Sequence, residues 1–248
     1  MFRRPPPRIG ELCRHGYRIR ALTTNTAGLY PEQIAGLNRR YASKGFEDRI
    51  RSVYDDFDPD RILVTSSFAA TSAYFLHIIS RIRPQQRITF IDTGFHFPET
   101  IGYKDYLIGL FGLNVVDLRA ESDKHEHTER EHLYRSDPDR CCAINKVDPL
   151  EMVKGDYDIW ISSLMRWQTP HRATLDIFEE RRGIIKFNPM LDVSEADRDA
   201  YIRDHDLPFH PLVAEGYHSI GCRHCTRAGE ARSGRWFGKS KTECGLHL

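Results

Sequence analysis

The stretch Arg61-Ile-Leu-Val-Thr-Ser-Ser-Phe-Ala-Ala70 joins a short apolar run to small and hydroxyl-bearing residues. Residues 70–82 then carry Leu, Ile and aromatic side chains at helical spacing. Such a sequence predicts a strand, a loop and a helix in that order. The same alternation returns in residues 87–92 (strand), 99–111 (helix) and 113–118 (strand). Strands that alternate with helices are typical of βαβ units, so we expect a parallel sheet.

The flanking sequence extends this α/β pattern in both directions. Residues 31–41 predict a helix with proline at an early position, and residues 157–162 and 183–188 predict two more strands. A further helix is expected over residues 195–205, before a tail rich in Gly, Cys, Arg and His. Ligands of such sheets bind at the carboxyl ends of the strands, beside the switch in strand order.

The expected fold class is therefore α/β, with a doubly wound, mostly parallel sheet flanked by helices and a flexible C-terminal arm. We expect one domain overall, because no internal repeat or low-complexity linker marks a second one. We expect residues 1–60 to form a helical N-terminal preface, residues 61–212 the α/β core, and residues 213–248 a cysteine-rich segment with the arm.

Composition excludes several classes of protein. Lys and Arg number 36 against 35 Asp and Glu, so there is no electrostatic case for nucleic-acid binding, and an anionic ligand must be held by local cations. The chain has no apolar run of roughly 18 residues and no secretory signal, which indicates a cytoplasmic protein without membrane association. Oligomeric state stays open, and a homo-oligomer is compatible with the sequence.

Residues 64–73 predict an anion site between a strand and a helix. Hydroxyl side chains and backbone N–H groups at a helix start can hold an anion, although an ordinary polar loop has the same composition. The stretch lacks both the Gly-Lys-Ser/Thr ending of a Walker loop and the Ser-Gly-Gly-x-Asp-Ser pattern of enzymes that split ATP into AMP and pyrophosphate. A smaller anion than pyrophosphate is therefore favoured.

Two pairs of cysteines predict a metal site. Cys141 and Cys142 are adjacent, and Cys222 and Cys225 form a CxxC motif. In a reducing cytoplasm such pairs indicate metal ligands or redox thiols more than disulfides. Adjacent cysteines suit a single tetrahedral zinc poorly, whereas a cubane cluster offers a separate iron to each thiolate. A four-cysteine cluster is favoured, with zinc and no metal as alternatives.

Cys244 is the candidate nucleophile. It lies near Lys239, Lys241 and His247 in sequence, and these groups could favour the reactive thiolate, while Gly245 permits the close approach of a substrate. An inert thiol is the plain alternative for a cysteine near a chain end. The sixth cysteine, Cys13, has no comparable setting and receives no role.

From about Ser66 to His247 the chain resembles the assimilatory adenylyl-sulfate and phosphoadenylyl-sulfate reductases, in particular their iron–sulfur-containing branch. The segments that carry this resemblance are Ser66-Ser-Phe68, Asp92-Thr-Gly-Phe-His-Phe-Pro-Glu-Thr100, Cys141-Cys-Ala-Ile-Asn-Lys-Val-Asp-Pro-Leu150, Arg166-Trp-Gln168 with Arg172, Lys186-Phe-Asn-Pro189, Gly216-Tyr-His-Ser-Ile-Gly-Cys-Arg-His-Cys-Thr226 and Glu243-Cys-Gly-Leu-His247.

The resemblance implies an adenine nucleotide alpha hydrolase-like fold and a reaction in two stages. Cys244 attacks the sulfur of the nucleotide, expels AMP and becomes S-sulfonated, and thioredoxin or glutaredoxin then releases sulfite. It further implies a [4Fe-4S] cluster on the four paired cysteines. The substrate-binding residues implied by the motifs are Ser66, Ser67, Phe68, Thr93, Lys146, Arg166, Arg232, Arg235 and His247.

Two segments resemble the cluster-free members instead, namely Ser66-Ser-Phe-Ala-Ala70 and Ile144-Asn-Lys146. We expect adenylyl sulfate as the substrate, with its 3′-phosphorylated form as the alternative. An ATP-dependent sulfur-transfer or tRNA-modifying enzyme is disfavoured by the missing pyrophosphate loop. A zinc-ribbon nucleic-acid-binding protein is disfavoured by the charge balance. The His-rich run of residues 124–132 lacks HExxH spacing and predicts a solvated helix face.

Overall fold

A six-stranded sheet with the order β3-β2-β1-β4-β6-β5 forms the centre of the computed structural model, which describes residues 31–239 and 241–247. The strands are β1 Ile62–Ser66, β2 Arg87–Ile91, β3 Asn114–Leu118, β4 Ile159–Ile161, β5 Phe178–Arg181 and β6 Ile184–Phe187. The part of the N-terminal preface before residue 31, and Cys13 with it, lies outside the described residues.

Five of the six strands run parallel, as the alternating sequence pattern predicted. β5 is an additional, antiparallel strand at the sheet edge, and the sequence pattern had not indicated it. A two-residue turn joins it to β6, and both turn residues have positive φ, 51° at Arg182 and 82° at Gly183. Such a turn matches the twist of a hairpin, which explains how the strand pairs despite its polar sequence Phe-Glu-Glu-Arg.

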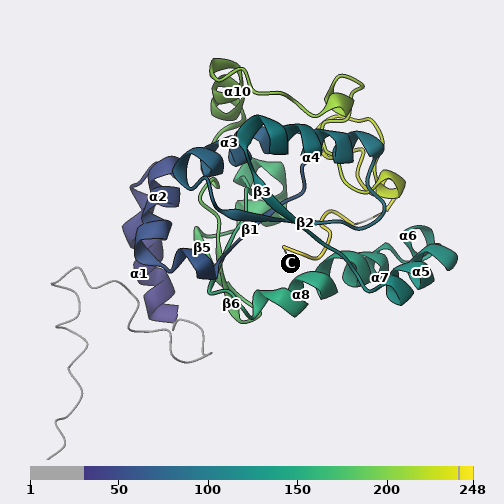
Figure 1. The fold of residues 1–248 in the computed structure, drawn as a ribbon, viewed down its shortest axis with the longest axis horizontal. Coiled ribbons are helices and arrows are strands. Elements are labelled where there is room, and N and C mark those ends of the chain that lie inside the picture. Colours follow the sequence, from purple (N-terminus) through teal and green to yellow (C-terminus); the bar gives the residue numbers. More distant parts are fainter. Residues whose placement is uncertain (1–30, 240, 248) are drawn as a thin grey trace, which may run out of the picture.

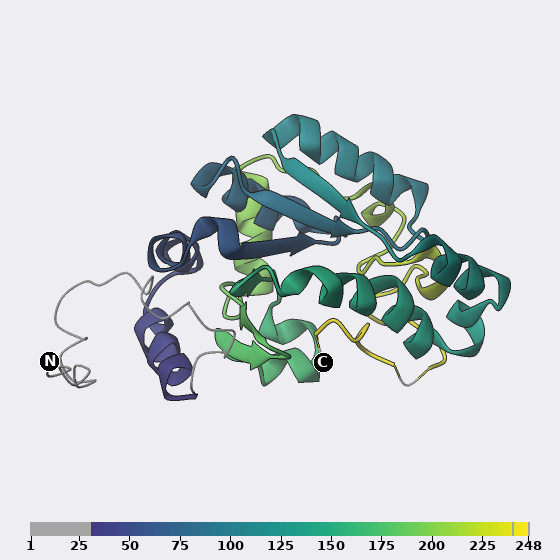
Figure 2. The same ribbon diagram turned by 60° about the horizontal axis from the view of Figure 1, so that its bottom comes forward.

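Helices cover both faces of the sheet. Figures 1 and 2 show α3 and α4 on one side of the strands and α8 on the other. The helices are α1 Pro31–Ala42, α2 Phe46–Asp56, α3 Ser72–Ile82, α4 Pro98–Phe111, α5 Ser122–Arg130, α6 Leu133–Ser136, α7 Pro138–Cys142, α8 Asp148–Lys154, α9 Pro170–Ala173 and α10 Glu195–Asp204. Among the described residues, none of these helices is long and apolar enough to cross a membrane.

The core forms mainly between α3 and the strands. Helix α3 buries aromatic and branched side chains, including Phe75 and Ile79, against the sheet. The helical preface is present from Pro31 onward, and its Tyr41 packs edge-on against Phe178, with ring centroids 4.8 Å apart. Helices α1 and α2 therefore extend the same core.

The strand order changes direction between β1 and β4. The chain winds outward from β1 to β2 and β3, then crosses back to β4 on the other side of β1. Because the connections on the two sides diverge, a crevice opens at the carboxyl ends of these two central strands. Ser66 ends β1 there, and Ser162 directly follows β4.

Arg49 is a buried cation that fastens the preface to the core. Its guanidinium donates to the backbone oxygens of Tyr41, Ala42 and Pro189, and it pairs with the half-exposed Asp192. The contact to Pro189 reaches the chain just after β6. A single side chain therefore satisfies backbone oxygens of two segments that are distant in sequence.

We expect the substitution Arg49→Met to lower the free energy of unfolding by about 3 kcal/mol, because it leaves buried oxygens without a donor. Urea denaturation would measure this change. Arg51→Met is the matched control, since Arg51 makes only an exposed i,i+4 pair with Glu47 and should cost less than about 0.5 kcal/mol. Equal decreases in the free energy of unfolding in Arg49→Met and Arg51→Met would contradict the proposed role of Arg49 in joining the preface to the core.

Candidate active site

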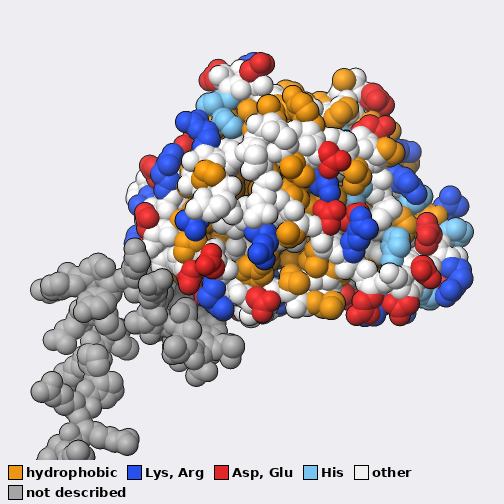
Figure 3. All heavy atoms as spheres, viewed as in Figure 1, with side chains coloured by type: hydrophobic (Ala, Val, Ile, Leu, Met, Phe, Trp, Pro, Cys, Tyr) orange, Lys and Arg blue, Asp and Glu red, His pale blue; other side chains and the backbone are white. Residues whose placement is uncertain are grey.

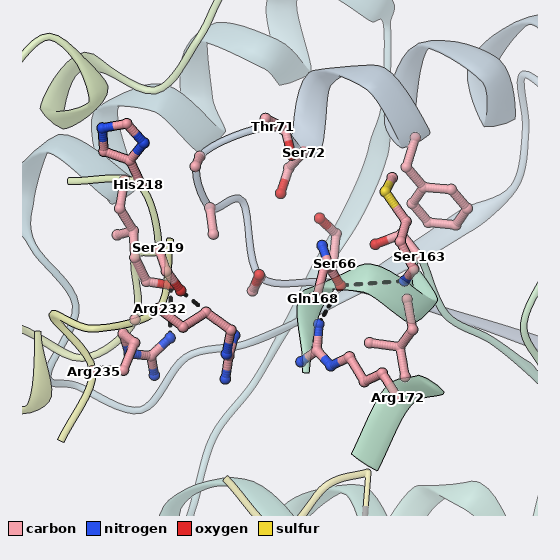
Figure 4. Close-up of a pocket in the computed structure, with 18 of the residues that line it drawn as sticks. Ser66, Thr71, Ser72, Ser163, Gln168, Arg172, His218, Ser219, Arg232 and Arg235 are labelled. Carbon is pink, nitrogen blue, oxygen red and sulfur yellow. Dashed lines mark hydrogen bonds between the residues drawn. The ribbon is translucent and has the colours of Figure 1, made fainter. Parts of the chain in front are cut away.

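A cavity of about 1070 Å³ opens at the carboxyl ends of β1 and β4. Figure 4 shows its wall, with Ser66 at the end of β1, Thr71 and Ser72 at the start of α3, and Ser163 after β4. Ser67 lines the cavity as well. The hydroxyl-rich loop therefore faces a large cavity at the switch in strand order, where a ligand was expected.

Phe68 shapes this loop without lining the cavity. Its backbone is left-handed, with φ 46°, and its N–H donates to Ser66 Oγ at 3.2 Å. The side chain is fully buried and packs edge-on against Phe90, with ring centroids 5.5 Å apart. The Phe68 side chain therefore belongs to the core, and its contact with a substrate stays a prediction.

Apart from Arg198, which pairs with Glu195 and Asp199, four cationic side chains line the same cavity, namely Lys146, Arg172, Arg232 and Arg235. Arg172 comes from α9, and Figure 4 shows it opposite Arg232 and Arg235, which belong to the C-terminal segment. Cations from three separate segments therefore meet in one cavity, which can attract an anionic ligand.

Arg166 does not join this group, although the motif suggested it. It stands in a 3₁₀ turn, Arg166–Gln168, and its guanidinium donates to the backbone oxygen of Leu175 at 3.1 Å. Arg172 of the same motif points into the cavity instead and donates to the side chain of Gln168. The structure therefore assigns the cavity position to Arg172.

Glu243 docks the C-terminal arm against these cations. Its buried carboxylate accepts from Arg172 Nε at 2.8 Å, from Arg172 Nη2 at 3.0 Å and from Thr169 Oγ1 at 3.0 Å, and Arg232 lies 3.5 Å away. Burial acts to raise the pKa of Glu243, but Arg172 outweighs it and the pKa lies below its usual value. The carboxylate is therefore ionised, and it fixes the residue that follows it, Cys244, in the cavity.

His247 lies beyond Cys244 and also lines the cavity. Its ring stacks on Trp160 with centroids 5.5 Å apart, and its backbone oxygen accepts from His171 Nε2 at 2.8 Å. Burial, aided by the nearby charge of Lys186, lowers the pKa of His247 well below its usual value. The ring is thus neutral near pH 7 and cannot supply the positive charge expected beside Cys244.

The two lysines near Cys244 in sequence are engaged elsewhere. Lys239 donates to the backbone oxygen of Arg135, and Lys241 pairs with Asp139 in α7. Figures 1 and 2 show the C-terminal segment running alongside α7 and α8, as these contacts require. Lys146 and Arg232 instead line the cavity together with Cys244.

The four paired cysteines come together next to the cavity. Cys141 and Cys222 are buried against Phe95 and Tyr134, and Cys225 packs on the same group. Burial, reinforced by the neighbouring thiols, raises the pKa of Cys141 to about 12. All four thiols are free of disulfides. Two pairs separated by some 80 residues of sequence thus form one thiol cluster.

Lys146 lies between this thiol cluster and the cavity. Burial acts to lower its pKa, but Cys222 and Cys142 reverse the direction and raise it. The same contact lowers the pKa of Cys222, although burial alone would raise that value. A cation that both lines the cavity and contacts the thiol cluster couples the two parts of the site.

Thr93 belongs to the thiol cluster and not to the cavity wall. Its hydroxyl lies 3.3 Å from Cys222 Sγ and accepts from the N–H of Phe95 at 3.2 Å. The Thr93 side chain therefore contacts a cysteine, and its position beside a nucleotide stays a prediction.

The described residues contain no group of three or more His, Cys, Asp or Glu side chains arranged to hold a single metal ion. Four converging thiols nevertheless suit an iron–sulfur cluster, because each thiolate of such a cluster binds a separate iron. The residues present therefore fit a cluster better than a single ion.

The His-rich run forms α5 and the turn after it, and it is largely the solvated face that the sequence predicted. Figure 3 shows histidine side chains gathered at the end of the molecule formed by α5 and α6. Two side chains differ, because Thr128 is buried and His125 turns inward to Asn145. Sequence reasoning missed these contacts, and the i,i+3 spacing of His125 and Thr128 was the available signal.

The fold and the cavity together define a doubly wound α/β protein with a cation-lined cavity at its switch in strand order. Residues 61–228 match the model of the phosphoadenosine phosphosulfate reductase domain. The chain therefore belongs to the family that this domain defines.

Several curated proteins and a solved structure are similar to the chain. The adenosine 5'-phosphosulfate reductase of Mesorhizobium japonicum is 40% identical over 223 residues, which cover 87% of each chain. The phosphoadenosine 5'-phosphosulfate reductase of Gloeobacter violaceus is 39% identical over 76% of this chain and 83% of its own. The crystal structure of phosphoadenylyl-sulfate reductase from Candida auris in a phosphate complex has a TM-score of 0.70 and 24% identity, over 82% of this chain and 100% of that one. This last likeness confirms the expected fold.

We expect Glu243→Ala to release the arm, because it leaves Arg172 unpaired in a buried place. Tryptic cleavage after Lys241 should then be about tenfold faster, since proteolysis follows the population of the open form. Mass spectrometry of timed digests would measure it. The control Glu230→Ala removes an exposed carboxylate that lies 3.8 Å from His218, and it should leave the cleavage rate unchanged. Cleavage at the wild-type rate in Glu243→Ala would show that the ion pair does not hold the arm.

Proposed function

We propose that this protein reduces adenylyl sulfate to sulfite and AMP, with Cys244 as the nucleophile. One observation carries the proposal: Cys244 is the only cysteine of the described residues that lines the cavity, and cations line it too. Lys146 and Arg232 line the cavity together with Cys244, and their positive charges can attract the sulfate group of a substrate. The names of similar reductases, which include adenosine 5'-phosphosulfate reductase, support the same choice.

In the first half-reaction the Cys244 thiolate attacks the sulfur of the sulfate group. A sulfur–sulfur bond forms and the bond from sulfur to the bridging phosphate oxygen breaks, so that AMP leaves with the electron pair. The product on the protein is a cysteine S-sulfonate. The negative oxygens around the attacked sulfur repel a thiolate, and Lys146, Arg232 and Arg235 are placed in the cavity to neutralise them.

In the second half-reaction a dithiol protein of the thioredoxin or glutaredoxin class attacks the Cys244 sulfur. Sulfite leaves with the electron pair of the sulfur–sulfur bond, and a mixed disulfide remains. The second thiol of the partner resolves it, which restores Cys244 and leaves the partner oxidised. The two electrons that convert sulfate-level sulfur to sulfite therefore come from the dithiol.

Cys141, Cys142, Cys222 and Cys225 would hold a [4Fe-4S] cluster. When bound, the cluster would supply a fixed negative centre next to Lys146. The four thiols, which come from two distant segments of the chain, would bind the cluster, and Lys146 would face the cavity. The Lys146 ammonium group would contact both the cluster-binding thiols and the substrate, and its contact with the thiols is consistent with the raised pKa of Lys146.

Charge pairing in the cavity favours adenylyl sulfate over its 3′-phosphorylated form. Arg198 is the remaining arginine of the cavity wall, and it is bound by Glu195 and Asp199. A second phosphate that bound at Arg198 would therefore meet a cation that is already paired with two carboxylates. The loop Ser66-Ser-Phe68, which resembles that of cluster-free members, is the feature that favours the alternative.

Anaerobic protein mixed with adenylyl sulfate but no dithiol should release about one AMP per chain and gain one sulfonate group on Cys244, because only the first half-reaction can proceed. Peptide mass spectrometry would locate the group. Cys244→Ser should lose steady-state sulfite release by about a thousandfold or more. Cys13→Ser, at a cysteine without an assigned role, is the control and should behave as wild type. Full activity of Cys244→Ser would refute the proposal.

Initial rates of sulfite release with the two nucleotides would test the choice of substrate. We expect kcat/KM for adenylyl sulfate to exceed that for the 3′-phosphorylated form by about a hundredfold, the effect of an unpaired phosphate beside Glu195 and Asp199. A preference for the 3′-phosphorylated nucleotide would overturn the choice while leaving the role of Cys244 intact.

A further inference from the structure

A buried chain of hydrogen bonds connects α5 with the first cysteine pair. His125 Nδ1 lies 2.9 Å from Asn145 Oδ1. Asn145 Nδ2 lies 3.2 Å from Thr128 Oγ1, 3.0 Å from the backbone oxygen of Cys141 and 3.9 Å from Cys141 Sγ. Asn145 is 1% exposed and Thr128 is fully buried. These polar groups therefore satisfy one another without solvent.

The direction of donation along this chain is determined. The Thr128 hydroxyl donates to the backbone oxygen of Lys124 at 3.0 Å, so its oxygen is free to accept from Asn145. The Asn145 amide must then present its NH₂ end to Thr128 and Cys141, which leaves its oxygen for His125. His125 consequently carries its proton on Nδ1 and donates. The hydrogen bond from His125 therefore keeps the Asn145 amide in this orientation and prevents its oxygen and nitrogen from exchanging places.

The helix geometry explains why Asn145 reaches Cys141. Between α7 and α8 the chain forms a π-helix, Ala143–Val147. The wider turn carries Asn145 back over the Cys141 carbonyl, four residues earlier. It also leaves the next residue, Lys146, on the cavity wall. Adjacent side chains thereby serve the thiol cluster and the cavity.

His125 also touches the segment that holds the second cysteine pair in place. Its ring packs against Phe95 with centroids 4.8 Å apart, and the backbone oxygen of Phe95 accepts from the N–H of Arg223, next to Cys222. Gly94 lies so close to this ring that a Cβ there would come within 2.5 Å of His125 Cε1. Glycine is therefore required at position 94 for the histidine to occupy its place.

We propose that His125 and Asn145 are positioning residues that orient the Cys141 sulfur toward the iron–sulfur cluster, an inference that rests on the cluster of the proposed function. The amide N–H groups fix the Cys141 backbone and approach its sulfur, and His125 fixes the amide. Partners of this kind orient the ligands of metal centres and limit their loss. The motif Cys141-Cys-Ala-Ile-Asn-Lys146 thus contains a supporting residue in addition to ligands.

Two variants remove single elements of this chain. Asn145→Leu keeps the branched shape of the side chain and removes its hydrogen-bonding groups, whereas His125→Phe keeps an aromatic ring against Phe95 and removes the Nδ1 donor. On anaerobically purified protein we expect bleaching of the visible iron–sulfur absorbance in air to be about tenfold faster in both. The visible circular dichroism should change as well, because the Cys141 sulfur is reoriented. His125→Gln retains an N–H donor and should restore slow bleaching.

Asn38→Leu is the matched control, since Asn38 also makes two hydrogen bonds, to the backbone of Phe178, far in sequence from the cysteines. It should lower stability toward urea but keep wild-type bleaching and circular dichroism. Wild-type bleaching in Asn145→Leu and His125→Phe, or fast bleaching in Asn38→Leu, would overturn the inference. Wild-type protein without iron and acid-labile sulfide would instead overturn the proposed cofactor, and the inference with it.

Discussion

The buried ion pair between Arg172 and Glu243 joins α9 to a segment 71 residues further along the chain. The side chains of Arg172 and Glu243 are 9% and 1% exposed. Each charged group has therefore lost its contact with water and interacts with its partner and with hydrogen-bonding groups of the protein instead. Loss of either partner leaves an uncompensated buried charge, at a cost of about 3–5 kcal/mol. Because Glu243 directly precedes Cys244, this pair fixes the backbone next to the proposed nucleophile.

A change in helix type organises the other half of the site. The chain passes from α7 to a π-helix after Cys142 and returns to an α-helix at Asp148. π-helical turns are rare and often occur at functional sites, because they widen the helix by one residue per turn. In this chain the turn directs Asn145 to the thiol cluster and Lys146 to the cavity. The two halves of the site therefore share one local distortion of the backbone.

The parallel strands and main helices could be predicted because their apolar periods are local properties of the sequence. β5 could not, since Glu179 and Glu180 interrupt any apolar run and the strand is recognisable only by its pairing with β6. The cysteine site and the hydroxyl loop followed from motifs. Whether Arg166 or Arg172 enters the cavity depends on a single 3₁₀ turn, and the inward turn of His125 depends on a contact with another helix. Sequence patterns do not encode such tertiary choices.

The docked arm also changes which anions the cavity can retain. With Glu243 in place, Arg172 already donates from two of its nitrogens to a carboxylate, and Arg232 shares the same group. A small inorganic anion would have to compete with a carboxylate that is tethered by the chain and therefore present at a high effective concentration. A nucleotide meets the same competitor but gains further contacts along the rest of the 1070 Å³ cavity. The docked arm thereby leaves Arg172 with its charge already compensated inside the cavity.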